Sequence, residues 1–355
     1  MNVKKAMKKQ NDVAMILGRH VLSSESESNV IFSPASINSA ITMHAAGSGG
    51  GLVAGEILSF LRSSSIDELK SVFRELSSIV YADSSASGGP KMRAVNGLWI
   101  EKSLPIDPKY KALFENFFKA VYVPVDFRSK AEEVRKEVNS WVEDHTNNLI
   151  KDLLPRESVT SRTNKIYANA LYFKGAWKRP FEKYYTKDRD FHMVNGTTVS
   201  VPFMTSYETQ KVRAYNGFKV LTDEAVMIPT ANSQSSTPGF LDSHIPRYKV
   251  ELEEFRIPKF KIEFGFSATS VLNQVGVLHS VSMYHKACVE IDEEGAEAAA
   301  ATADVEDDGC ALDMGPPPKK IDFVADHPFI FLIREDKTGT VLFFGQLFKP
   351  SEFLF

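Results

Sequence analysis

The sequence predicts an α+β fold built as one large domain. Apolar residues recur with a helical period over most of the first 154 residues, and the pattern then changes to the alternation of strands. Helices followed by strands, without regular alternation of the two, are typical of α+β proteins. The 355 residues contain neither a long Gly/Ser linker nor an internal repeat. We therefore expect a single domain over residues 1–355.

The first half of the chain is expected to be mainly helical. The helix at Pro34 has the clearest start, because Ser33 can cap it and proline at the first helical position loses no hydrogen bond. It should end at the glycine-rich run 47–51. The expected helices span residues 3–22, 34–47, 52–61, 66–82, 108–118 and 131–154, and short strands are expected at 29–31, 94–100 and 120–127.

Strands should dominate the second half. Two of them, 329–334 and 340–347, should pair as a hairpin around residues 336–339, where Asp, Lys, Thr and Gly follow one another. The other expected strands are 165–173, 190–192, 199–204, 211–215, 219–221, 256–264 and 282–292.

Composition and charge exclude several classes of protein. With 42 basic and 45 acidic residues, the net charge is −3, which argues against a globally basic nucleic-acid-binding protein. No run of 18 apolar residues occurs, so no membrane-spanning helix is expected. Cys288 and Cys310 are too few for a disulfide framework. The lysine-rich start lacks the uninterrupted apolar stretch of a signal peptide, so the cytoplasm or nucleus is expected.

Motifs that would carry enzymatic chemistry are missing from the sequence. The run 47–51 fits neither a Walker loop nor a dinucleotide-binding loop. His285 and Cys288 resemble a thiol nucleophile with its base, but three residues apart on a strand they should face opposite sides. Residues 304–309 begin like a calcium-binding loop, but Gly315 stands where the bidentate glutamate is required. We expect no enzymatic activity, no metal and no cofactor.

Residues 290–318 are the part of the chain that ordinary packing does not explain. The segment contains ten acidic residues and no Lys or Arg. It is either an acidic surface loop or a segment able to enter a sheet as a strand. In an extended conformation one face would carry only small uncharged residues, Ala296, Ala298, Ala300 and Thr302, whereas Glu297 lies on the other. Small uncharged residues can be buried between strands without the cost of desolvating a charge.

Five motifs together give the sequence a close resemblance to the serpin family, and to plant-type serpins in particular. They are 29–34, 169–177, the Phe203-Met204 pair, 293–302 and 323–331. The resemblance covers nearly the whole chain. It implies a serpin fold, with an N-terminal helical part, three β-sheets including a large central one, and an exposed reactive-centre loop at 293–318. It also implies a protease inhibitor that acts as a suicide substrate. Serpins are themselves the standard example of a loop that enters a β-sheet and releases stored strain.

The resemblance implies a role for several residues. A protease of the serine or cysteine class would attack the loop at the Gly309–Cys310 bond, and the loop would then insert into the central sheet. Trp177 would lie at the top of the gap that opens. A polar cluster beneath the opening point would comprise Ser33, Ser36, Asn169 and His285. The hinge that enters first would comprise Glu293, Glu294, Gly295, Ala296, Glu297, Ala298, Ala299, Ala300, Ala301 and Thr302.

Departures from the family pattern leave a second function open. Ala296 stands where the family mostly has Thr or Ser, and Gly309 offers no side chain to a specificity pocket. The stretches 222–236 and 265–281 look shortened, so we expect lost central strands and unpaired strand edges. The alternative is a non-inhibitory or degenerate serpin-fold protein with a binding role or no activity. In either case a monomer is expected, with no nucleic acid or membrane partner; the resemblance also allows the extracellular space.

Overall fold

The computed structural model describes most of the chain. The described residues are 3–25, 27–83, 91–104, 107–148, 150–174, 177, 180–215, 218–222, 225–228, 243–277, 282–293, 320–335 and 338–350.

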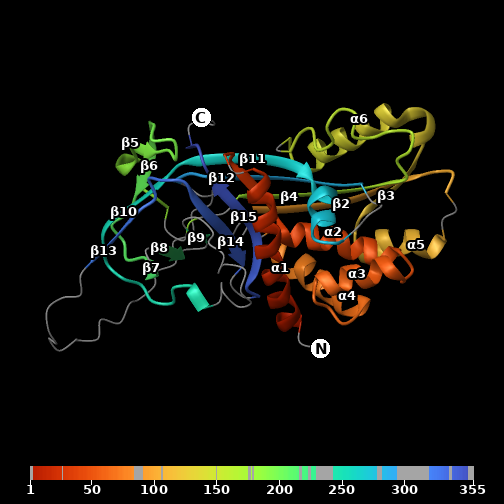
Figure 1. The fold of residues 1–355 in the computed structure, drawn as a ribbon, viewed down its shortest axis with the longest axis horizontal. Helices are drawn as coiled ribbons and strands as arrows, with labels where there is room; N and C mark the ends of the chain where they lie inside the picture. The colour runs from red at the N-terminus through yellow and green to blue at the C-terminus, as the bar shows by residue number, and fades with distance from the viewer. Residues whose placement is uncertain are drawn as a thin grey trace.

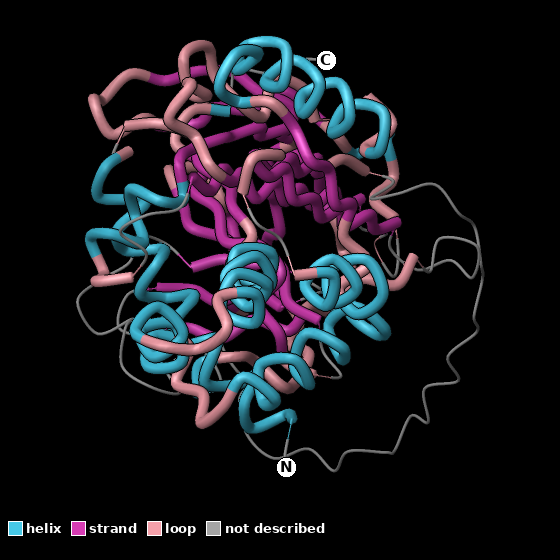
Figure 2. Tube along the Cα trace, turned by 90° about the vertical axis from the view of Figure 1, so that its right-hand side faces the viewer, coloured by secondary structure: helices cyan, strands magenta, loops and turns pink. Residues whose placement is uncertain are grey.

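The helices lie on both sides of a layer of strands (Figure 2). On one side α1 to α5 form a group, and on the other side lies α6 (Figure 1). Two of the helices continue into a single π-helical turn. The helices are α1 (Val3–Ser24), α2 (Pro34–Gly47), α3 (Leu52–Phe60), α4 (Ile66–Glu75) with η1 (Leu76–Val80), α5 (Pro108–Ala112) with η3 (Leu113–Phe117), α6 (Phe127–His145) and α8 (Ala268–Gln274).

The predicted helix 131–154 is wrong at its C-terminal end, and at its start an additional turn, residues 127–129, precedes it across the non-helical backbone of Lys130. Helix α6 begins at Phe127, because Asp126 caps it by accepting a hydrogen bond from the Ser129 N–H at 2.9 Å. It ends at His145, after which the chain takes positive φ angles at Asn147 and Asn148. The apolar pattern continues beyond the helix because Ile150 still packs into the same core.

The large central sheet has five strands in the order β11-β12-β4-β2-β3. Strands β12 and β4 lie next to each other and are parallel. Each is antiparallel to its other neighbour, β12 to β11 and β4 to β2. The outer strand β3 runs parallel to β2. The strands are β2 (Lys91–Glu101), β3 (Val121–Val125), β4 (Lys165–Lys174), β11 (Phe260–Ser267) and β12 (Ser282–Ile291).

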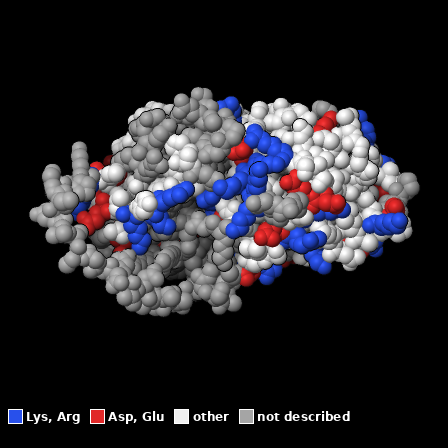
Figure 3. Space-filling model, turned by 90° about the horizontal axis from the view of Figure 1, so that it is seen from below, with Lys and Arg blue, Asp and Glu red and all other residues white. Residues whose placement is uncertain are grey.

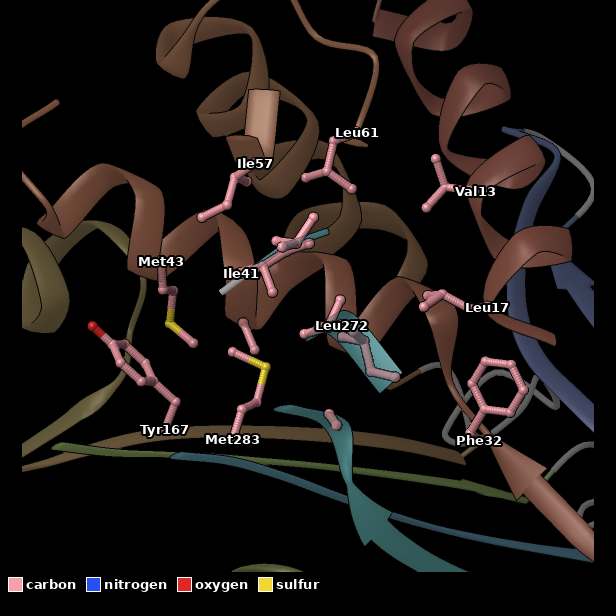
Figure 4. Packing of buried hydrophobic residues seen from close by; sticks show 14 of the residues in the cluster. Val13, Leu17, Phe32, Ile41, Met43, Ile57, Leu61, Tyr167, Leu272 and Met283 are labelled. Atoms are coloured by element: carbon pink, nitrogen blue, oxygen red, sulfur yellow. The ribbon is translucent and has the colours of Figure 1, made fainter. Parts of the chain in front are cut away.

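Helices pack against both faces of this central sheet. Tyr167 and Met283 point from the sheet toward Ile41 and Met43 of α2 (Figure 4). On the opposite face, Cys288 belongs to the cluster around Val138 of α6. On the α6 side the cover is partial, because Glu263 of β11, which stands opposite Cys288, is exposed.

A smaller four-stranded sheet lies at the end of the molecule where β4 and β12 end (Figure 1). Its order is β13-β10-β6-β5, and it comprises β5 (Lys187–His192), β6 (Thr198–Thr205), β10 (Leu252–Pro258) and β13 (Ile321–Val324). The single strand predicted at 256–264 is therefore wrong, because it is divided between β10 here and β11 in the central sheet. The division falls at Lys259, whose N–H donates to the Pro202 carbonyl at 2.8 Å.

The third sheet has six strands in the order β1-β15-β14-β9-β8-β7. The predicted hairpin between β14 and β15 is confirmed, with Glu335 opposite Thr340. The strands are β1 (Val30–Phe32), β7 (Lys211–Tyr215), β8 (Phe218–Thr222), β9 (Ala225–Ile228), β14 (Phe329–Glu335) and β15 (Thr340–Leu347).

The two shortened stretches do not leave the edges we expected. In 222–236, the apolar residues of β9 form a strand that pairs with β14 on one side and β8 on the other. In 265–281, helix α8 buries Leu272 in the core. The expectation that the central strands would be lost is wrong where the structure describes these stretches, because four apolar residues suffice to join neighbouring strands.

In the described part of the face seen from below, acidic side chains are interspersed with basic ones (Figure 3). A concentration of Lys and Arg lies near the middle of that face, on the side where α1 begins (Figure 3). Among the described helices, none combines the length and the apolar character that crossing a membrane requires.

Candidate functional site

The site predicted from the sequence begins where α2 starts. Ser33 caps this helix, because its Oγ accepts a hydrogen bond from the Ser36 N–H at 3.1 Å. The Ser33 N–H in turn donates to Nε2 of His285 at 2.9 Å. The cap therefore joins the helix to strand β12 across 252 residues of sequence. Both serines and His285 are almost completely buried.

Two further polar residues, Asn169 and Asn96, continue this cluster across the central sheet. The strand registers place Asn169 of β4 opposite His285 on one side and opposite Asn96 of β2 on the other. The Ser36 hydroxyl donates to Asn169 Oδ1, and Asn169 Nδ2 donates to Asn96 Oδ1 at 2.7 Å. We name Ser33, Ser36, Asn96, Asn169 and His285 the polar row.

Asn96 is the member that the sequence did not reveal. It lies within an expected strand, but nothing along β2 indicates which residue of β4 it faces. The available signal was that Asn96 is a polar residue between Val95 and the apolar residues that follow Gly97 in the same strand. Pairing it with Asn169 requires the register between strands that lie 73 residues apart.

His285 is neutral and carries its ring proton on one particular nitrogen. Because its Nε2 accepts from Ser33, the ring proton must reside on Nδ1. Burial lowers the pKa of His285 to about 3. Nδ1 finds no hydrogen-bond partner among the described residues, and Phe266 packs edge-on at 5.9 Å between ring centroids. Protonating Nε2 would break the contact with the helix cap.

The polar row crosses the boundary between β4 and β12, which we name the parallel seam. Beyond the polar row the two parallel strands of the seam end at the same level, and the chain leaves β12 there at Asp292. A segment that turned back between them would run antiparallel to both. Parallel pairing is slightly less stable per residue than antiparallel pairing. Such a segment would exchange one parallel pairing for two antiparallel ones.

The chain leaving β12 is fixed at a second cluster, which we name the upper anchor. The Trp177 indole donates to the Asp292 carbonyl at 2.6 Å, and the Phe181 N–H donates to the Glu293 carbonyl at 2.9 Å. The two aromatic rings pack edge-to-face at 5.2 Å. Lys259 Nζ lies 2.7 Å from Glu293 Oε2.

Glu293 is buried but charged. Burial alone would raise the pKa of its carboxyl. Hydrogen bonds from Lys259, from the Glu293 N–H and from Thr186, together with the charge of Lys259, outweigh burial and lower the pKa from the ordinary value of 4.5. The carboxylate therefore remains ionised at neutral pH, with the ammonium group as its partner. The ion pair ties Glu293 to the residue at which β10 passes into β11.

The structure agrees with the rejection of a catalytic dyad. Cys288 packs on the α6 side of the sheet, whereas His285 contacts the start of α2 on the other side. Burial raises the pKa of the Cys288 thiol to about 11, so a reactive thiolate is not populated at neutral pH. Within the described part of the chain, no group of three or more His, Cys, Asp or Glu side chains could hold a metal ion.

Of the predicted hinge, only Glu293 lies in the described part of the chain. The hinge residues after it and the predicted bond lie outside the described residues. They are Glu294, Gly295, Ala296, Glu297, Ala298, Ala299, Ala300, Ala301, Thr302, Gly309 and Cys310.

Curated proteins of plant origin are similar to this chain over nearly its full length. Serpin-Z1 of Arabidopsis thaliana is 73% identical over 374 aligned positions, which cover 99% of this chain and 97% of the relative. The alignment is at least 19 positions longer than the 355 residues of this chain, in keeping with internal shortening. A protein called probable non-inhibitory serpin-Z5, also from Arabidopsis thaliana, is 53% identical over 380 positions, covering 99% of this chain and 86% of the relative.

Solved structures agree with these relatives. The structure described as native stressed Arabidopsis AtSerpin1 is 43% identical, with a TM-score of 0.86 and coverage of 99% of both chains. Uncleaved ovalbumin is 21% identical, with a TM-score of 0.78 and coverage of 96% of this chain and 99% of that one; it supports the fold alone. The family model described as "Serpin (serine protease inhibitor)" matches residues 8–350. The chain therefore belongs to the serpin family.

Proposed function

We propose that this protein inhibits a protease of the serine or cysteine class as a suicide substrate. The parallel seam is the observation that carries the proposal. It combines a parallel strand pair, polar side chains that can exchange hydrogen-bond partners, and a chain that leaves β12 where both strands end. The loop that follows has the small uncharged face needed to enter as a strand.

The chemistry belongs to the protease, and this chain supplies the bond that is cut. The protease's serine oxygen or cysteine sulfur attacks the carbonyl carbon of Gly309. The bond to the Cys310 nitrogen breaks, and that nitrogen leaves as an amine after taking up a proton. An ester or thioester then joins Gly309 to the protease. Water would hydrolyse this link if the loop stayed outside the sheet.

Insertion of the loop competes with that hydrolysis. The freed segment would run back from Glu293 between β4 and β12 and form backbone hydrogen bonds with both strands. Ala296, Ala298, Ala300 and Thr302 would enter the sheet without burying a charge. The attached protease would be carried to the far end of the seam. The protein would act as a monomer, without a cofactor and without catalysing a reaction of its own.

The thiol chemistry of the chain supports a reducing compartment. Cys288 is a buried free thiol, and two cysteines in the whole sequence do not provide a disulfide framework. We propose the cytoplasm or nucleus as the place of action.

The experiment is incubation of the purified protein with pancreatic elastase, chymotrypsin, papain and an Asp-directed protease. Inhibition predicts a complex that survives SDS and migrates near the summed masses. It also predicts that the cleaved protein unfolds at a higher temperature than the intact one, because a strand has been added to the sheet. Cleavage within 303–315 without complex or thermal stabilisation would contradict the proposal.

A second function, binding without inhibition, is supported by two observations. Gly309 provides no side chain for a specificity pocket, and a relative at 53% identity is called probable non-inhibitory. In that case the loop is cut as an ordinary substrate. The partition between complex and cleaved product in the same experiment separates the two functions.

A further inference from the structure

Three tyrosines form an exposed cluster on the four-stranded sheet. Tyr184 and Tyr207 are 79% and 80% exposed, and Tyr185 between them is 40% exposed. The ring centroids of Tyr184 and Tyr185 lie 5.6 Å apart, and those of Tyr185 and Tyr207 lie 5.2 Å apart. Both contacts are edge-to-face, so the three rings form one continuous surface. We name it the tyrosine patch.

The patch brings together two segments of sequence at one edge of the sheet. Tyr184 and Tyr185 belong to the short 3-10 helix η4 (Lys183–Tyr185), which leads into the edge strand β5. Tyr207 follows the neighbouring strand β6. Lys187 Nζ lies 5.0 Å from the centroid of the Tyr184 ring, a cation–π contact that holds this ring in place.

The position of the patch relates it to the reactive loop. Phe181, whose N–H holds the Glu293 carbonyl at 2.9 Å, stands three residues before Tyr184. At the opposite edge of the same sheet, β13 starts at Ile321, just after the loop. Both ends of the loop thus join the body of the protein at or beside this sheet. We therefore expect a protease that attacks the loop to approach this end of the molecule.

The chemistry of the patch fits a protein partner. Tyrosine offers a large, stiff contact area with a hydroxyl, loses little conformational entropy on binding, and is enriched among the residues that dominate interface energies. In the core, by contrast, such rings would be covered, as Tyr167 is at 0% exposure. We propose that the tyrosine patch is a second contact surface for the protease that attacks the reactive loop. This inference rests on the proposed function.

The test measures how fast a protease attacks the loop, whether the product is a complex or a cleaved chain. The variants are the double substitution Tyr184→Ala and Tyr207→Ala, with Leu52→Ala as the matched control. Leu52 is 80% exposed at the start of α3, in the helical part of the molecule. Elastase, chymotrypsin, papain and an Asp-directed protease are each mixed with the three proteins, and the second-order rate constant is measured.

For at least one protease of this panel, the double variant should react about tenfold or more slowly, which corresponds to about 1.4 kcal/mol of lost binding. The control should stay within about twofold, and the thermal midpoints of all three proteins should agree. Rate constants of the double variant within about twofold for every protease would overturn the proposal. So would a change in oligomeric state measured by sedimentation without a change in rate, because the patch would then join two copies of this chain. The partition between complex and cleaved product tests the proposed function separately.

Discussion

Two sheets of this protein are held together by different means. The hairpin of β14 and β15 is antiparallel and apolar, and its side chains are buried on both faces from Phe329 to Ile333. The ring of Phe331 lies 5.2 Å from that of Phe260 and covers Gly345, where an added Cβ would collide with the ring. Such interlocking tolerates little displacement.

The parallel seam between β4 and β12 differs from the hairpin in strand direction, in the polarity of its side chains and in how it is held. Its facing residues include small side chains such as Ala170 and polar ones such as Asn169 and His285. Hydrogen bonds to α2 hold it, and hydrogen bonds can be exchanged for others without leaving a cavity. From this comparison we expect the hairpin of β14 and β15 to keep its packing when other parts of the protein move, and we name it the frame. We expect the seam to be the place where the structure can separate.

The largest effect should come from breaking the frame. Phe331→Ala removes a ring from a fully packed position, so the free energy of unfolding should fall by about 3–5 kcal/mol. Urea unfolding followed by circular dichroism measures it. Leu52→Ala, on the exposed start of α3, should change the value by less than about 0.5 kcal/mol. A loss below about 1 kcal/mol for Phe331→Ala would mean that the hairpin is not the fixed element.

The second largest effect should come from a substitution that tests whether the loop inserts at the seam. Ala300→Arg places a charge on the hinge face that must be buried, so the yield of SDS-stable complex should fall at least about hundredfold, equivalent to about 2.7 kcal/mol. The loop should still be cut. Ala299→Arg lies on the opposite face of the same strand and should keep the yield within about threefold. Equal losses in both variants would contradict insertion as a strand.

The free energy of unfolding should depend on pH through His285, which lies at the seam and not in the frame. The pKa of His285 is about 3 in the folded protein and 6.5 in the unfolded chain, so the unfolded chain takes up the proton first. The stabilisation is complete above pH 6.5 and is lost as the pH falls toward 3. Between pH 7 and pH 5 this residue should cost about 2 kcal/mol of unfolding free energy.

His285→Gln tests this dependence, because glutamine keeps an acceptor for the Ser33 N–H but does not titrate. The fall in unfolding free energy from pH 7 to pH 5 should shrink by about 2 kcal/mol relative to the wild type. His44→Gln is the control. Its pKa of about 4 gives a similar pH slope, but it contacts the Tyr167 hydroxyl and lies outside the polar row. Only His285→Gln should change the rate of complex formation; an equal change in both variants would argue against a special role for the row.

The smallest effect should come from the upper anchor. Glu293→Gln and Lys259→Met each break the ion pair, and their double-mutant coupling should be about 1–2 kcal/mol in urea unfolding at pH 7. Because the pKa of Glu293 is lowered in the folded state, its contribution is complete above pH 4.5 and declines as the pH falls below that value. Purely additive effects at pH 7 would show that the pair does not fasten the end of β12.

Much of the local structure could be predicted from the sequence. The Ser33 cap and Pro34 fixed the start of α2, and alternation placed His285 and Cys288 on opposite faces of β12. The end of α6 could not be predicted, because residues 150–154 keep the apolar spacing of a helix while a turn at Asn147 and Asn148 ends it. Nor could the division of 256–264 between two sheets, since Lys259 interrupts the strand without a turn residue after Pro258.

By itself, the sequence determined most of the helices and strands and their order, the opposite orientation of His285 and Cys288, and the unusual composition of residues 290–318. Periodicity and capping act between residues a few positions apart, so they can be read along the chain. Only the tertiary structure decided that Asn96, Asn169 and His285 stand side by side, that β9 bridges β8 and β14, and that three tyrosines meet at one edge of the four-stranded sheet. Those neighbours are far apart in sequence, and the register that unites them is set by how whole sheets pack against their helices.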